Sequence, residues 1–309
     1  MISAVITFED NTVSIHSSQT KEVGKEFPKG FYTCSIDPDT GKFRIKKRNL
    51  PELNRPLETE ENKMVFNTVD NFFKKDTQEK INRIGFVHKL GILLHGKQGT
   101  GKTSILNNIA HKLVKSHDAI VLLCNSISDL EGGIELATNI REIQNNPIVI
   151  ISDEFERYAD ELESEIKNIL DGVDSIDNSL FLAATNYISQ IPDTLKKRPS
   201  RFKIVQELKG IKSKSIMKGV LKELSNKLSP KLMSNERIDE LLQDINSCTL
   251  DELKHMALDE ITNTFIPKTT TTIGFNANSN QKSKSNQKSK LVKRPQKTSV
   301  IDSDFNSNI

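Results

Sequence analysis

Short apolar runs rich in β-branched residues alternate with longer amphipathic stretches between about residues 57 and 207. The runs that predict strands are KLGILLH (89–95), AIVLLC (119–124), IVIIS (148–152), LFLAAT (180–185) and FKIV (202–205). The stretches between them, such as 104–115 and 161–173, space their apolar residues three and four positions apart, as an amphipathic helix does. Buried strands separated by helices favour a parallel sheet covered on both faces, so the pattern predicts an α/β fold.

The pattern is different before and after this region. Residues 1–56 contain strand-like segments, and Asp37–Gly41 supplies turn residues between two alternating runs. We therefore expect a small β-rich N-terminal region, either as a separate domain or as an extension of the sheet. After residue 207, helical periodicity predicts a helical subdomain over 208–266. Its helices are expected at 215–228, 235–245 and 249–261, the last opened by the capping box Thr249-x-x-Glu252.

Residues 267–309 form a tail of Thr, Asn, Ser, Gln and Lys with the near-repeat NQKSKS-NQKSK. This composition cannot bury enough apolar surface to offset the entropy of ordering the chain, so the tail is predicted to be disordered. Eight Lys/Arg and two Asp give the tail a charge of +6, which leaves −3 of the total +3 for residues 1–266. A basic tail can contact nucleic acid by counterion release. The alternative is a solvated tether, because no aromatic residues are interleaved with the Lys residues to stack on bases.

Composition excludes several classes of protein. The three cysteines lie far apart, with no CxxC pair and no histidine at metal-ligand spacing, which disfavours a disulfide framework or a zinc site. The N-terminus lacks the basic start of a signal peptide, and no apolar run approaches the ~20 residues that cross a bilayer. We therefore expect a cytoplasmic protein that does not contact the membrane.

The strongest motif is GKQGTGKT at residues 96–103, a full GxxxxGK[ST] between a predicted strand and a predicted helix. Glycines allow backbone N–H groups to curl around phosphates, and the helix presents its N-terminus to the anion. Lys102 is expected to reach the β- and γ-phosphates, and the hydroxyl of Thr103 to bind Mg²⁺. The residues expected to bind the nucleotide ATP are Gly96, Gln98, Gly99, Thr100, Gly101, Lys102, Thr103 and Ser104.

Two acids follow the predicted strand 148–152, at the end where ligands bind in open α/β sheets. We expect Asp153 to hold Mg²⁺ and Glu154 to polarise the attacking water. Two adjacent acids are more often a solvated turn, but this pair follows a buried strand downstream of a P-loop. Glu156 is assigned no function.

Farther along, Asn186 ends the predicted strand 180–185 and could orient the water opposite the γ-phosphate. A lone Asn at a strand end is ordinarily a cap or turn residue. Arg198 and Arg201 follow in the segment LKKRPSRF, which leads into the next strand. They are better placed to reach the γ-phosphate of a neighbouring subunit than that of their own chain. Two solvent-facing basic residues are the alternative interpretation.

Together, the P-loop, the DE pair, ATN and RPSRF resemble, in this order and spacing, the AAA subgroup of AAA+ ATPases. The stretches GFVHKLGILLHGKQGTGKTSILNNIA and NILDGVDSIDNSLFLAATN are especially similar to the Bcs-type mitochondrial AAA chaperones. Over about 65–265 the resemblance implies a P-loop ATPase core with a five-stranded sheet at 57–207, a C-terminal helical lid, and a ring of usually six subunits. It implies Walker A residues Lys102 and Thr103, Walker B residues Asp153 and Glu154, sensor 1 Asn186, and trans arginine fingers Arg198 and Arg201.

The sequence also departs from the family pattern. Ser200 replaces the usual Gly of RPGRF, and the loop before it is one residue longer, which blurs the fit of Arg198 more than that of Arg201. The alignment places Gly132 or Gly133 where peptide-threading members carry a pore-loop aromatic. It also places 84–86 where the subgroup contacts adenine, and the last helix lacks an Arg at the sensor-2 position.

These features predict a Mg²⁺-dependent ATPase that works as a homo-oligomeric ring and remodels a protein or macromolecular complex. Without a pore aromatic, processive threading of unfolded polypeptide is disfavoured. One alternative is a DNA-metabolism ATPase, such as a clamp or helicase loader, whose tail contacts nucleic acid. Another is a nucleotide-dependent structural assembly protein, although the intact Glu154 argues against incidental hydrolysis.

Overall fold

The computed structural model describes residues 4–9, 12–17, 26–36, 43–50, 59–171, 175–228 and 233–262. The predicted turn at 37–41 and the predicted disordered tail at 267–309 lie outside these residues. In the part of the chain that is described, no helix is long and apolar enough to cross a membrane.

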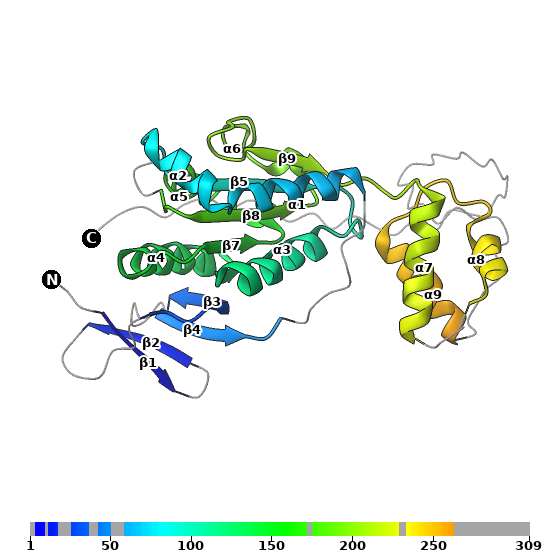
Figure 1. Ribbon diagram of the computed structural model, residues 1–309, viewed down its shortest axis with the longest axis horizontal. Coiled ribbons are helices and arrows are strands. Elements are labelled where there is room, and N and C mark those ends of the chain that lie inside the picture. Colours follow the sequence, from blue (N-terminus) through cyan, green and yellow to red (C-terminus); the bar gives the residue numbers. More distant parts are fainter. Residues whose placement is uncertain are drawn as a thin grey trace, which may run out of the picture. The chain divides into compact units, whose positions relative to one another are not determined.

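The centre of the molecule is a parallel sheet (Figure 1) whose strands follow the apolar runs of the sequence. The first four of its strands lie within one residue of the predicted bounds, and the last begins two residues later. Their order is β6-β7-β8-β5-β9, so the strand before the P-loop lies between two strands that come later in the chain. The bounds are β5 Lys89–His95, β6 Ile120–Cys124, β7 Ile148–Ser152, β8 Ser179–Thr185 and β9 Ile204–Glu207.

The N-terminal strands extend this sheet beyond β6, so the expectation of five strands is wrong. Strand β3 (Gly30–Ile36) pairs with β6 in parallel, and β4 (Phe43–Arg48) pairs with β3 in antiparallel orientation. The hairpin of β1 (Ala4–Glu9) and β2 (Thr12–Ser17) pairs with β4 through β2, so the described residues form nine strands in the order β1-β2-β4-β3-β6-β7-β8-β5-β9. The last seven strands in this order are mostly parallel. The physical reason is that β6 would otherwise expose an unpaired backbone edge, which β3 covers.

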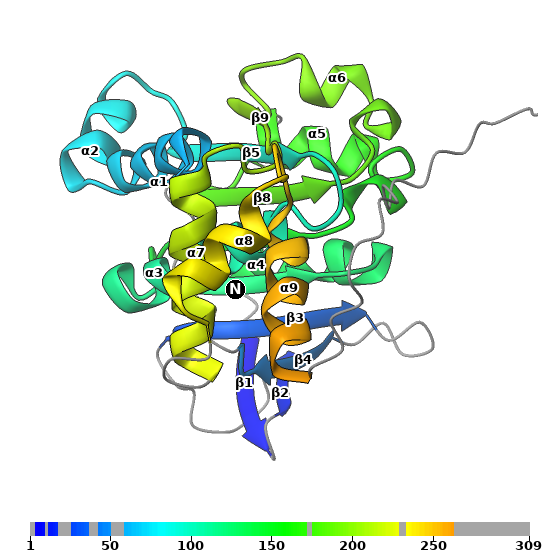
Figure 2. The ribbon, with the colours of Figure 1, turned by 90° about the vertical axis from the view of Figure 1, so that its right-hand side faces the viewer.

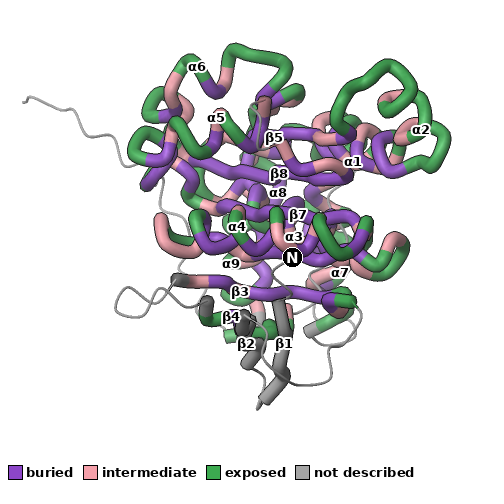
Figure 3. Tube along the Cα trace, turned by 90° about the vertical axis from the view of Figure 1, so that its left-hand side faces the viewer, coloured by how far each residue is buried: buried purple, intermediate pink, exposed green. Residues whose placement is uncertain are grey.

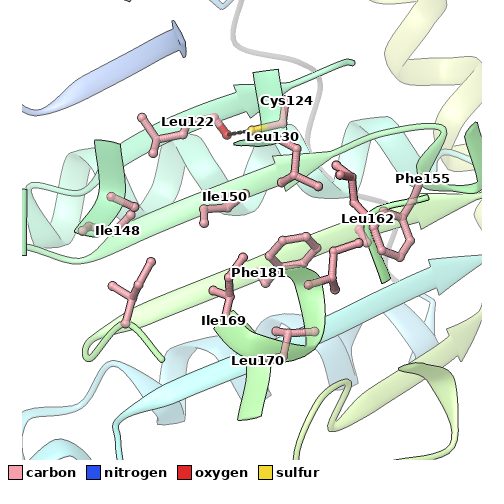
Figure 4. Packing of buried hydrophobic residues seen from close by; sticks show 14 of the residues in the cluster. Leu122, Cys124, Leu130, Ile148, Ile150, Phe155, Leu162, Ile169, Leu170 and Phe181 are labelled. Atoms are coloured by element: carbon pink, nitrogen blue, oxygen red, sulfur yellow. Dashed lines mark hydrogen bonds between the residues drawn. The ribbon is translucent and has the colours of Figure 1, made fainter. Parts of the chain in front are cut away.

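The strand side chains alternate between two hydrophobic clusters, one on each face of the sheet. In β7, Ile148 and Ile150 pack in the cluster that contains helices α4 (Ile127–Ile143) and α5 (Glu163–Asp171), as Figure 4 shows in part. The intervening Val149 and Ile151 belong to the opposite cluster. That cluster includes residues of α1 (Glu60–Phe72) and α3 (Lys102–His117). Figure 3 shows buried stretches along the strands and exposed stretches along α2 (Lys75–Arg83) and α6 (Asp193–Lys196).

The segment aligned with a pore loop is helical, which corrects that expectation. Residues 127–143 form the single helix α4, and Ser126 caps its N-terminus by accepting a hydrogen bond from the Asp129 N–H. Gly132 and Gly133 are both buried, and a Cβ on Gly133 would lie 2.9 Å from the sulfur of Cys124. Gly133 lets the helix approach the sheet, and neither glycine occupies an exposed loop.

The three predicted C-terminal helices are present and pack around a cluster of their own (Figure 2). They are α7 (Lys214–Leu228), α8 (Asn235–Leu242) and α9 (Leu250–Thr262). Met217, Leu221 and Leu253 are fully buried between them. The predicted capping box is confirmed, because Glu252 N–H donates to Thr249 Oγ1 (3.2 Å) and Thr249 N–H donates to Glu252 Oε2 (2.6 Å).

Candidate active site

A cavity of about 510 Å³ opens at the C-terminal ends of the parallel strands. It brings together the P-loop, the acids after β7 and the amide after β8, which the sequence places up to 88 residues apart. The predicted residues that line it are Gln98, Gly99, Gly101, Lys102, Thr103, Ser104, Asp153, Glu154 and Asn186. It is also lined by Asn125, Arg157, Asp251 and Lys254, for which no motif was recognised.

The P-loop has a backbone that requires glycine at its two ends. Gly96 has a φ of +144°, and a Cβ there would lie 2.3 Å from the carbonyl oxygen of Leu208. Gly101, directly before α3, has a φ of +93°. Glycine adopts these angles at no steric cost, so the chain can turn sharply from β5 into α3. Thr100 is buried, and its hydroxyl donates to the carbonyl of Lys97 (2.8 Å).

Lys102 is the buried cation of the loop, with 6% of the residue exposed. Its Nζ donates to the carbonyl oxygens of Gly96 (2.8 Å) and Lys97 (3.0 Å). Burial lowers the pKa of Lys102 below its ordinary value, and the charges of Asp153 and Glu156 oppose that shift. A desolvated ammonium gains strongly from an anion placed beside it, because screening by water is weak there.

Thr103 and Asp153 join the two main motifs of the sequence directly. Thr103 Oγ1 donates to Asp153 Oδ2 at 2.5 Å, so the first turn of α3 meets the end of β7. A hydroxyl and a carboxylate are hard oxygen donors of the kind that Mg²⁺ prefers. The donor set therefore fits Mg²⁺.

The acids after β7 lie on a tight turn held by buried aromatic residues. Glu154 has left-handed backbone angles (φ 51°, ψ 43°) and precedes the single-turn helix η1 (Phe155–Arg157). Phe155 is fully buried in the cluster of Figure 4 and contacts the ring of Phe181 edge to face. Glu154 itself is exposed, and its Oε2 lies 2.6 Å from Nη2 of Arg157.

Asn186 lies at the end of β8, and Glu156 holds the backbone there. The Asn186 N–H donates to Glu156 Oε1 at 3.3 Å, while Glu156 Oε2 is buried and has no hydrogen-bond partner. Glu156 was assigned no function from the sequence. Its carboxylate links the turn after β7 to the end of β8, which is a structural contact outside the cavity lining.

Arg198 and Arg201 do not line the cavity, and they differ in their surroundings. Arg201 is 8% exposed, with Nε donating to Asp171 Oδ2 (2.9 Å) and Nη1 donating to the carbonyl of Thr194 (2.6 Å). The side chain of Arg198 is 65% exposed, and its Nη1 lies 3.7 Å from Asp171 Oδ2. Arg198 is therefore accessible to another molecule, whereas Arg201 is engaged within its own chain.

The cavity residues that the sequence analysis did not indicate lie after β6 (Asn125), on η1 (Arg157) and on α9 (Asp251 and Lys254). Asn125 directly follows β6, so the rule that ligands bind at strand C-termini could have indicated it. Asp251 and Lys254 lie in the first turns of α9, where the Asp251 N–H donates to the carbonyl of Gly99 (3.2 Å) and Lys254 Nζ lies 3.2 Å from Asp251 Oδ1. No local pattern indicates that contact, because it depends on where the C-terminal helices meet the P-loop.

The segment aligned with adenine contacts lies at the opposite end of the sheet. Residues 84–86 precede β5, whereas the P-loop follows it, and seven residues of strand span about 20 Å. Ile84 and Phe86 are exposed by 69% and 68%. The strand between the two segments keeps them apart, so the expectation for 84–86 is wrong.

Comparison with known proteins finds a match for the segment that supplies most of the cavity wall. Residues 92–209 match the ATPase family associated with various cellular activities (AAA). This segment is similar to an AAA ATPase domain. The chain is 29% identical over 166 residues to the cell division cycle protein 48 homolog of Archaeoglobus fulgidus, covering 48% of this chain and 22% of that protein. It is 28% identical over 157 residues to the vesicular-fusion protein SEC18 of Candida albicans, covering 42% and 19%.

The AAA match defines which parts of the cavity lie inside the segment that is similar to the family. The chain spans about a fifth of the length of these curated relatives. The match begins within β5, so the P-loop, the acids after β7 and Asn186 lie inside it, whereas Asp251 and Lys254 lie outside it. The finer resemblance to Bcs-type chaperones stays a prediction.

Proposed function

We propose that this chain is a Mg²⁺-dependent ATPase that works as a homo-oligomeric ring and uses ATP to remodel a protein or macromolecular complex. The observation that carries the proposal is the hydrogen bond between Thr103 and Asp153. It joins the predicted Walker A and Walker B motifs, 50 residues apart, at the wall of one cavity. The AAA match over 92–209 supports the same reaction class.

Catalysis in this arrangement is mostly positioning and electrostatics. Backbone N–H groups of the P-loop and the N-terminus of α3 bind the phosphates, and Lys102 exchanges its loop carbonyls for phosphate oxygens. Thr103 and Asp153 would hold Mg²⁺, which supplies charge neutralisation for the phosphates. Glu154 polarises the attacking water, and Asn186 orients it from the end of the neighbouring strand.

The ring completes the site with an arginine from the next subunit. Arg198 suits that function because its guanidinium is exposed, whereas Arg201 is buried against Asp171. Arg201 then fixes the segment that presents Arg198. This assignment narrows the pair expected from the sequence to one arginine finger, with Arg201 as a positioning residue.

Two variants test the reaction. Lys102→Ala should abolish detectable ATP binding, because it removes the cation that the loop presents to the phosphates. Glu154→Gln should bind ATP with nearly unchanged affinity but hydrolyse it poorly, since the oxygen donors Thr103 and Asp153 remain. Calorimetric titration and a phosphate-release assay measure the two effects, and wild-type turnover by Glu154→Gln would refute the Walker B assignment.

A mixing experiment tests the ring. Arg198→Ala and Lys102→Ala subunits should each be nearly inactive alone. In a mixed ring, a subunit with an intact P-loop receives an intact arginine when its neighbour is the Lys102→Ala chain, so activity should recover. Rings that mix without any recovery, or a monomer that hydrolyses ATP at the full rate, would contradict a finger acting between subunits.

A further inference from the structure

A second accessible arginine, Arg157, already lies in the cavity. It belongs to neither the P-loop nor the acid pair, and no predicted motif includes it. Its Nη2 lies 2.6 Å from Glu154 Oε2, and its side chain is 65% exposed. The residues of the described cavity wall that carry positive charge are Lys102, Arg157 and Lys254.

The backbone of Arg157 is fixed, although its side chain is largely exposed. Its N–H donates to the carbonyl of Glu154 (3.0 Å), which closes the turn of η1. The residues that flank Glu156 and Arg157 in the sequence are buried: Phe155 is fully buried and Tyr158 is 2% exposed. The Tyr158 hydroxyl donates to the carbonyl of Cys124 (3.0 Å), which ties the turn to the end of β6. The guanidinium is thus tethered at the cavity wall and can move over a short range.

The pair with Glu154 is one that a phosphate can replace. Both side chains are about half exposed or more, and exposed ion pairs are weak because water screens them. A terminal phosphate carries more charge than a carboxylate and accepts the two parallel hydrogen bonds of a guanidinium. Because Glu154 is the residue proposed to polarise the attacking water, its partner lies on the side of the cavity where the terminal phosphate reacts.

We propose that Arg157 binds the terminal phosphate of ATP from within the same chain, and that it leaves Glu154 when it does so. Glu154 is then free to contact the attacking water. The inference rests on the proposed function and deepens it. In it, Arg157 both binds the γ-phosphate and determines whether Glu154 is available to the attacking water. Arg201 cannot act in this way, since it is buried against Asp171 outside the cavity.

The experiment compares the affinity for a non-hydrolysable β,γ-imido ATP analogue with the affinity for ADP, in the full chain, by calorimetry. Arg157→Ala should bind the analogue at least about tenfold more weakly and bind ADP nearly as before, because only the analogue carries the third phosphate. Arg157→Lys keeps the charge but lacks the planar guanidinium, so its affinity for the analogue should lie between those of the wild type and Arg157→Ala. Arg83→Ala is the matched control, since Arg83 is an exposed arginine in an ion pair with Glu79 on α2.

The same measurement in a Glu154→Gln background separates direct contact from an effect through Glu154. If Arg157 binds phosphate, Arg157→Ala still weakens the analogue about tenfold in that background. If the loss disappears there, or if Arg157→Ala leaves the ratio of the two affinities unchanged in the wild-type background, the inference is overturned. Wild-type protein that binds neither nucleotide would instead refute the proposed function itself.

Discussion

Two turns of this molecule carry an arginine paired with a carboxylate at nearly the same distance. Arg157 lies 2.6 Å from Glu154 inside the cavity, and Arg201 lies 2.9 Å from Asp171 outside it. Their surroundings differ, because the side chain of Arg157 is 65% exposed and that of Arg201 is 8% exposed. The comparison teaches that exposure, more than distance, separates a pair that can exchange partners from one that holds the fold.

The energetic reason is solvation. An exposed pair is worth about 0–1 kcal/mol, whereas removing one partner of a buried pair costs about 3–5 kcal/mol because the other charge stays desolvated. The sequence shows an arginine and an acid in both places and cannot distinguish them. The following predictions use this difference.

The largest effect is expected from Gly91→Ala, which tests how tightly the Arg201 segment is packed. A Cβ on Gly91 would lie 2.1 Å from the carbonyl oxygen of Arg201, so β5 and that segment must separate. We expect a loss of about 3 kcal/mol or more in the free energy of unfolding. Gly219→Ala is the control, because Gly219 is exposed in α7 and a Cβ there would meet no atom within 4 Å apart from the backbone of its own helix. This substitution should stabilise the protein by about 0.5–1 kcal/mol. Denaturant unfolding measures both.

A similar loss is expected when the buried pair itself is broken. Arg201→Ala leaves Asp171 and the carbonyl of Thr194 without their donor, and we expect a cost of about 3 kcal/mol. Arg198→Ala, three residues earlier and exposed, should stay within about 0.5 kcal/mol of the wild type. Equal losses in the two variants would show that Arg201 is no more important for the fold than Arg198.

Acid should weaken the same pair. Burial raises the pKa of Asp171, but hydrogen bonds from Arg201 and Ser200 outweigh it and hold the pKa below its ordinary value of 3.8. Because the folded pKa lies below the unfolded one, this carboxylate stabilises the fold above pH 3.8, and the contribution is lost as the pH falls through the folded pKa. Wild-type protein should therefore lose more stability than Asp171→Asn between neutral pH and pH 2.5, as measured by thermal unfolding at each pH. Parallel pH profiles would contradict this assignment.

Much of the fold could be predicted because the signals are local. Strand β7 is apolar at every position and buried at every position, so a short apolar run sufficed to find it. The pairing of β3 with β6 could not be predicted in the same way, since parallel pairing joins segments about 90 residues apart without any turn to mark it. The pore-loop expectation for Gly132 and Gly133 comes from alignment to a family, whereas the apolar spacing of Leu130, Ala137 and Ile140 is that of a helix packed on the sheet.

The site divides in the same manner. The P-loop and Asp153 were predictable because strand–loop–helix order and strand ends determine where they lie. No sequence motif indicates Arg157. Its side chain reaches the cavity because the short helix after Glu154 is fixed by the burial of Phe155 and Tyr158, and that burial depends on the folded structure. Likewise, the burial of Arg201 depends on Asp171, 30 residues away on α5.

The smallest change in stability is expected from Arg157→Ala, and it completes the comparison with Arg201. Because both members of the Arg157–Glu154 pair are exposed, the free energy of unfolding without nucleotide should change by no more than about 0.5 kcal/mol. With the ATP analogue, the gain in stability follows the logarithm of ligand concentration over Kd, so a weaker Kd gives a smaller gain. The variant should thus match the wild type in melting temperature without nucleotide and with ADP, and fall below it only with the analogue. Arg201→Ala should show the reverse, a lower melting temperature in all three conditions. If Arg157→Ala also lowered the melting temperature without nucleotide, the turn would need its arginine to fold, and the distinction between the two arginines would be lost.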